Sequence, residues 1–148
     1  MTRVAIVNTE GEVVHLWNSG AQVEPEGEWS TDKTKTVVHL NTNIDASYFM
    51  SRNYYKGGAW KERAEKPGDY YNWKDEAWVL DSTALFKELR IERNRRLYNC
   101  DWTQASDSPL STSKKAEWAE YREALRSVPA NNSGVSNLNS VVWPDIPS

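Results

Sequence analysis

Apolar residues recur at helical spacing in two segments of the C-terminal part of the chain. The first segment begins near Asp81 and carries four apolar side chains on or near one face, Leu85, Phe86, Leu89 and Leu97. The second begins after Pro109, aligns Trp118, Tyr121 and Leu125, and is expected to end before Pro129. Because Asp, Ser and Pro residues interrupt the spacing between the segments, the pattern predicts a two-helix hairpin within residues 82–148.

A short apolar run follows the second segment near the end of the chain. Val141, Val142 and Trp143 come after a polar stretch and directly before Pro144. A large aromatic side chain in such a run gains free energy by burial, and the hairpin offers the nearest apolar surface. We therefore expect Trp143 to dock on the hairpin.

The first eighty residues have β-rich runs separated by turn residues. Residues 3–7 and 13–17 flank a loop that contains Gly11, and residues 70–73 and 77–80 flank a second turn with aromatic side chains on both sides. Each pair predicts a β-hairpin. The expected fold class is therefore α+β, with a small β-rich N-terminal module of hairpins over residues 1–81 and a C-terminal two-helix hairpin over residues 82–148.

Other parts of the N-terminal half give weaker signals. Residues 36–40 are predicted to form a strand, whereas the polar residues 19–35 are expected to be a loop. Residues 45–50 fit one helical turn or a strand equally well. Gly57-Gly58 and Pro67-Gly68 mark turns.

Composition limits the partners and the chemistry. The 148 residues have a net charge of −3 and a mean hydropathy of −0.77, and 8 Trp and 7 Tyr must supply much of the buried surface. The arginines of residues 90–96 are interleaved with Glu88 and Glu92, which reduces the positive charge of this segment. Nucleic acid is therefore not an expected partner. One cysteine, Cys100, excludes an intrachain disulfide, and we expect no metal and no cofactor. The N-terminus turns polar too soon for a signal peptide, and no membrane partner is expected.

No catalytic residue is expected. Two histidines lie in strand-like segments, and Cys100 lies where the negative end of a helix dipole disfavours a thiolate. Carboxylates near residues 69–81 are compatible with a glycosidase, but turn and capping roles explain them better. For Asp101 and Asp107 we likewise expect capping of the loop between the helices rather than metal binding.

The order and spacing of residues in the hairpin resemble the bacteriophage tail assembly chaperone family, whose domains are associated with tail fibres. The similarity covers about residues 89–147 and includes Arg93-Asn94, Asp107, Pro109-Leu110, Arg122, Arg126, Pro129 and Pro144. Eight of its residues are expected to form the hairpin core and family motif, namely Asp101, Trp102, Thr103, Gln104, Trp118, Tyr121, Leu125 and Trp143. The resemblance implies a role in building a phage tail and implies no reaction or cofactor.

Three functions agree with these patterns. A β-rich module ahead of the family segment favours a non-enzymatic structural or adaptor component of the tail, baseplate or tail-fibre attachment region. A transient tail-fibre assembly chaperone that is absent from the mature virion is the first alternative. A glycan-binding module that recognises the host is the second. We expect synthesis in the host bacterial cytoplasm and localisation in the virion, at the phage tail.

Two groups of residues are candidate binding sites. The expected partners are other phage tail proteins, such as tail-fibre, baseplate or adaptor subunits, or further copies of this chain in the particle. A basic edge that could bind such partners contains Arg90, Arg93, Arg95, Arg96 and Arg122. Aromatic residues that could stack on sugar rings are Trp60, Tyr70, Tyr71 and Trp73.

Overall fold

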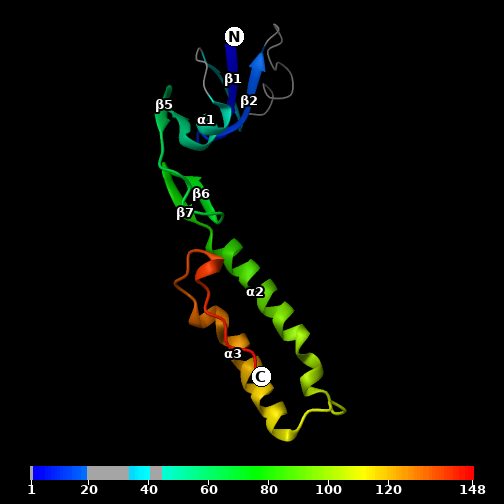
Figure 1. Cartoon of the computed structure of the whole chain (residues 1–148). Coiled ribbons are helices and arrows are strands. Elements are labelled where there is room, and N and C mark those ends of the chain that lie inside the picture. The colour runs from blue at the N-terminus through cyan, green and yellow to red at the C-terminus, as the bar shows by residue number, and fades with distance from the viewer. Residues whose placement is uncertain (1, 20–33, 41–44) are drawn as a thin grey trace. The chain divides into compact units, whose positions relative to one another are not determined.

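The computed structural model of the chain describes residues 2–19, 34–40 and 45–148 (Figure 1). Helices and strands both occur in these residues, so the α+β prediction is confirmed. The chain divides into two compact units. The first contains Met1–Pro67 and Tyr71–Val79, and the second contains Gly68–Tyr70 and Leu80–Ser148.

The first unit begins with a three-stranded antiparallel sheet of order β2-β1-β3. Its strands are β1 (Thr2–Val7), β2 (Val13–Ser19) and β3 (Thr36–Leu40), as the sequence predicts. The loop predicted over residues 19–35 lies mostly outside the described residues, although Ser19 belongs to β2. One face of the sheet contributes to a cluster of buried residues, Ala5, Val7, Val13, Leu40 and Phe49.

The turn between β1 and β2 needs a glycine. Gly11 has a φ of +82°, and a Cβ at this position would lie 2.1 Å from the carbonyl oxygen of Tyr55. The Asn8 side chain closes the same turn, because its Oδ1 accepts hydrogen bonds from the backbone N–H groups of Glu10 and Glu12 at 3.0 and 2.9 Å.

Residues 45–62, which the sequence leaves open, form a helix and a hairpin. Asp45 caps α1 (Ala46–Arg52) by accepting a hydrogen bond from the N–H of Tyr48 at 2.8 Å, and this cap favours the helical alternative. Strands β4 (Asn53–Lys56) and β5 (Ala59–Glu62) are joined by Gly57 and Gly58, both at positive φ. The turn was predicted, but the two strands were not. Phe49 and Trp60 pack edge to face, with ring centroids 4.7 Å apart.

The second predicted hairpin forms from β6 (Tyr71–Lys74) and β7 (Ala77–Leu80). Its two turn residues, Asp75 and Glu76, have φ values of 50° and 61°, which glycine or asparagine adopts more readily. The Glu76 carboxylate is held there by Lys61 Nζ at 3.0 Å and by the Tyr54 hydroxyl at 2.9 Å. These hydrogen bonds lower the pKa of Glu76 below its usual range.

The second unit is the predicted helical hairpin. Helix α2 (Ser82–Asn99) is capped by Asp81, and α3 (Thr112–Asn131) is capped by Ser111. The two helices lie side by side, and the chain after α3 turns back along them (Figure 1). Four of the apolar side chains facing the interior are almost fully buried, Leu85, Leu89, Leu125 and Val128.

Helix α3 does not end before Pro129, as the sequence predicted, but continues to Asn131 with the proline inside it. The residue before a proline is usually driven out of helical geometry. Here Val128 is only 2% exposed and packs with Leu89 and Val141, so its burial favours the helical conformation. Both the backbone N–H and the side-chain Nδ2 of Asn132 then donate to the Val128 carbonyl, at 3.1 and 2.8 Å.

The segment after α3 completes the core of the hairpin. It passes through a short 3₁₀-helix, η2 (Leu138–Ser140), and is then clamped by buried Asn132, which accepts from the N–H of Val142 at 2.8 Å and donates to its carbonyl at 3.3 Å. Trp143 packs against both buried clusters of the hairpin, and the Arg96 guanidinium lies 4.2 Å from its ring centroid. The terminal segment is therefore a structural part of this unit.

Candidate protein-binding surface and a polar cavity

The loop end of the hairpin is built around the DWTQ run. Cys100 caps α2, and residues Asp101–Gln104 form the 3₁₀-helix η1. Thr103 is fully buried and its hydroxyl donates to the Cys100 carbonyl at 2.6 Å. Gln104 reaches the other helix, because its Nε2 donates to the Lys115 carbonyl at 3.0 Å. Gln104 therefore fixes the loop to the start of α3, while Thr103 closes the η1 turn onto the end of α2.

Arg122 is the second tie between the loop and α3. Its Nη1 lies 2.8 Å from Asp101 Oδ1 and donates to the Leu97 carbonyl at 2.8 Å and to Cys100 Sγ at 3.2 Å. Burial lowers the pKa of Arg122, but the hydrogen bonds to Cys100 and Asp101 outweigh this effect and the pKa is raised. Arg122 therefore holds the loop end together from within, and it is not part of an exposed basic edge.

An aromatic row runs across the loop end and consists of Trp102, Trp118 and Tyr121. The ring centroids of Trp102 and Trp118 are 6.4 Å apart, and those of Trp118 and Tyr121 are 5.7 Å apart at an interplanar angle of 87°. Tyr121 is buried and Trp118 is half-buried, whereas Trp102 is 51% exposed. The expectation that Trp102 belongs to the core is therefore wrong. The tight 3₁₀ turn directs Thr103 inward and leaves its neighbour facing outward.

A cavity of about 270 Å³ lies beside the aromatic row. Its lining comes from α2, α3 and the terminal segment, with Arg95, Arg96, Asn99, Cys100, Trp118, Tyr121 and Ile146. Ile146 is 64% exposed, and Tyr98, in the last turn of α2, is 77% exposed. We call this part of the surface the loop-end surface, defined by Trp102, Trp118 and Ile146.

The remaining arginines of the predicted basic edge are divided between different contacts. Arg95 binds the Glu92 carboxylate through two hydrogen bonds of 2.7 Å, and Arg96 binds it at 2.8 Å. Arg96 also lies on Trp143. On the same helix, Arg90 donates to the Phe86 carbonyl and Arg93 donates to the side-chain oxygen of Asn94. Each of these four arginines is therefore engaged by neighbouring residues, and their role in binding a partner stays a prediction.

Glu92 provides a prediction for the pH dependence of the helical unit. Hydrogen bonds from Arg95, and then from Arg96, lower its pKa from 4.5 to about 2. A carboxyl with a lowered pKa contributes stability above pH 4.5, and this contribution is lost as the pH falls toward 2. In urea unfolding followed by far-UV circular dichroism, Glu92→Gln should therefore reduce the loss of stability between pH 4.5 and pH 2. Glu123→Gln, which removes an exposed pair with Arg126, is the control, and equal pH profiles for the two variants would contradict the assignment.

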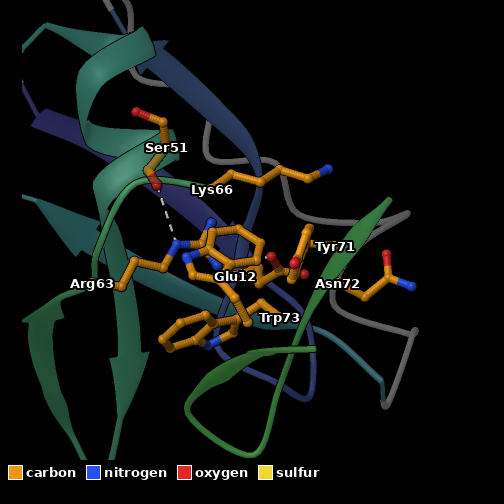
Figure 2. Close-up of a pocket in the computed structure, with 8 residues that line it drawn as sticks. Glu12, Ser51, Arg63, Lys66, Tyr71, Asn72 and Trp73 are labelled. Atoms are coloured by element: carbon orange, nitrogen blue, oxygen red, sulfur yellow. Dashed lines mark hydrogen bonds and ion pairs between the residues drawn. The ribbon is translucent and has the colours of Figure 1, made fainter. Parts of the chain in front are cut away.

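The first unit contains a second cavity, of about 330 Å³ (Figure 2). One of its lining residues is Arg63, which is only 7% exposed. The Cζ atom of its guanidinium lies 4.9 Å from the ring centroid of Trp73 and 4.5 Å from that of Trp78. The guanidinium donates to Glu12 Oε1 at 2.8 Å and to the carbonyls of Ser51 and Met50 at 3.2 and 3.3 Å. Arg63 thus connects the β1–β2 turn, α1 and the β6–β7 hairpin.

The residues predicted to stack on sugars are not brought together as a group. Trp73 is only 7% exposed, and Trp60 is half-buried against the core of the sheet, so neither offers an open ring face. Tyr70 belongs to the second unit. Of the four, Tyr71 and Trp73 line the cavity, together with Lys66, Asn72 and Trp78, which sequence reasoning missed. The two-residue period of the β6–β7 hairpin was available as a signal for Trp78, but Lys66 lies in a segment without periodicity.

The described residues offer neither a metal-binding cluster nor a membrane-spanning helix. Among those residues there is no group of three or more His, Cys, Asp or Glu side chains that could hold a metal ion. Within the same residues, the helices are too short or too polar to cross a membrane.

The hairpin defines the class of protein to which this part of the chain belongs. The family model of the phage tail assembly chaperone protein matches residues 86–148, which contain most of α2 and all of η1, α3 and the terminal segment. Residues 86–148 therefore match a phage tail assembly chaperone domain, which supports a role related to phage tails. No curated protein and no solved structure matches the chain.

Proposed function

We propose that this protein is a non-catalytic tail assembly chaperone that binds a tail-fibre chain in the host cytoplasm through the loop-end surface. The observation that carries the proposal is the exposure of Trp102 and Ile146 within the segment that the family model matches. Exposed aromatic and aliphatic side chains of this kind are typical of protein-binding surfaces. A fibre chain that has not yet assembled still exposes apolar surface, which is the chemistry that this surface complements.

The way in which the loop end is fixed supports the same role. Gln104 and Arg122 hold η1 against α3 and Thr103 closes the η1 turn, so Trp102 stands on a rigid base although half of its surface is exposed. A rigid aromatic side chain loses little conformational entropy when it enters a partner's pocket. Trp102 is therefore the residue that we expect to contribute most to binding.

Replacing Trp102 with alanine should weaken binding to the tail-fibre chain at least tenfold, because truncation of a central interface tryptophan typically costs about 2 kcal/mol or more. The measurement is titration of the purified fibre chain of the same phage, together with its soluble yield on co-expression. Tyr48→Ala, which removes a 57% exposed aromatic from the first unit, is the matched control. Unchanged affinity of a folded Trp102→Ala variant would contradict the assignment of this surface.

A structural adaptor role in the virion is the second candidate, and the first compact unit favours it. The family model does not cover this unit, so it adds surface that an assembly chaperone of the hairpin type does not require. In this alternative, residues 1–81 form an attachment module that stays bound to a tail or baseplate subunit. The protein content of finished particles separates the two candidates.

A further inference from the structure

We propose that the cavity of the first unit binds an acidic saccharide, with one sugar ring and its carboxylate held beside Lys66 and Tyr71. This site is separate from the loop-end surface and does not depend on the chaperone proposal. Its volume of about 330 Å³ is near the lower end of the range for small-molecule sites, about 300–1,000 Å³. The cavity therefore suits a single ring better than a folded partner.

The charges around the cavity favour an anionic ligand. Arg63 and Glu12 neutralise each other, and Glu12 also accepts a hydrogen bond from Asn8 Nδ2 at 3.3 Å. Lys66 also lines the cavity, and among the residues that the structure describes it has no hydrogen-bond or ion-pair partner. The lining thus carries one uncompensated positive charge, which is available to a carboxylate.

The other lining groups favour a sugar over an acidic peptide. Tyr71 and Trp78 are half-buried rings at the cavity, and Glu12 and Lys66 supply polar side chains to the same lining. Ser51 faces Arg63 through its backbone carbonyl (Figure 2). Aromatic rings with a few polar groups match the C–H faces and hydroxyl edges of a pyranose.

The test is a titration of the full ¹⁵N-labelled chain, followed through the indole N–H signals of its tryptophans. The probes are a galacturonate trimer, an uncharged galactose trimer and a triglutamate peptide. The signals of Trp73 and Trp78, assigned with Trp→Phe variants, should shift saturably with the galacturonate trimer, and the other two probes should bind roughly tenfold more weakly. Such a result would establish an acidic saccharide as the ligand class.

Substitutions then locate the carboxylate and the ring. Lys66→Gln should weaken galacturonate binding roughly tenfold, Lys66→Arg should largely retain it, and Tyr71→Ala should weaken both trisaccharides. Lys74→Gln, on an exposed lysine of β6 that does not line the cavity, is the matched control. Absence of saturable shifts, equal binding of the galactose trimer or triglutamate, or an unchanged Lys66→Gln variant would each overturn the proposal.

Discussion

Replacing Arg63 with methionine is expected to lower the free energy of unfolding of the first unit by about 3–5 kcal/mol, the usual cost of breaking a buried ion pair by removing one partner. Methionine keeps much of the apolar volume between Trp73 and Trp78 but loses the hydrogen bonds to Glu12, Ser51 and Met50. Glu12 would then lose its ion-pair partner, and the carbonyl groups of Ser51 and Met50 would lose the hydrogen bonds from Arg63. Urea unfolding followed by tryptophan fluorescence measures the effect.

Two further variants test whether the buried charge is the cause. Lys61→Met removes an exposed ion pair with Glu76 and should cost only about 0–1 kcal/mol. Adding Glu12→Gln to Arg63→Met removes the stranded carboxylate, so the double variant should lose less stability than the sum of the two single losses. Similar losses for Arg63→Met and Lys61→Met would show that Arg63 does not hold this unit together.

Replacing Trp143 with alanine is expected to destabilise the helical unit by about 3 kcal/mol, near the lower end for tryptophan-to-alanine changes because the side chain is only half-buried. Trp143 packs against the cluster around Leu89 and the cluster around Leu125, and its ring supports Arg96. Its removal therefore leaves a gap between α2 and α3 along the terminal segment. The measurement is urea unfolding followed by the helical signal in far-UV circular dichroism.

The neighbouring residue gives the control for this experiment. Val142 is 75% exposed and touches the unit mainly through its backbone hydrogen bonds to Asn132, so Val142→Ala should change the stability by less than about 0.5 kcal/mol. If Trp143→Ala were as mild as Val142→Ala, the terminal segment would not be a structural part of the hairpin.

Local sequence signals predicted much of the fold. The start of α2 could be read from Asp81 and from the spacing of Leu85 and Leu89, and β-hairpins could be read from apolar runs around short turns. Strands β4 and β5 were missed because both sequences mix polar and aromatic residues, whereas the equally short β6–β7 hairpin has one fully apolar strand, Ala77–Leu80. The continuation of α3 through Pro129 was missed because it depends on the burial of Val128 against residues distant in sequence.

The sites were harder to predict than the fold. Sequence identified the residues of the loop end but not the direction in which their side chains point. Trp102 turns outward from a 3₁₀ turn, while Arg122 turns inward to Asp101 and the end of α2. In the first unit, Arg63 donates to the carboxylate of Glu12, which is 51 residues away in sequence. It also donates to the carbonyls of Ser51 and Met50, which are 12 and 13 residues away. No local sequence pattern predicts hydrogen bonds between residues so far apart in the chain.

Quantitative mass spectrometry of purified phage particles, compared with lysate of infected cells, tests the chaperone proposal most directly. The proposal predicts that the protein is abundant in lysate, where it migrates with the tail-fibre chain on size fractionation, and that it is depleted from finished particles. Stoichiometric presence in particles, at a copy number that matches the tail symmetry, would contradict a transient chaperone and establish the adaptor role instead.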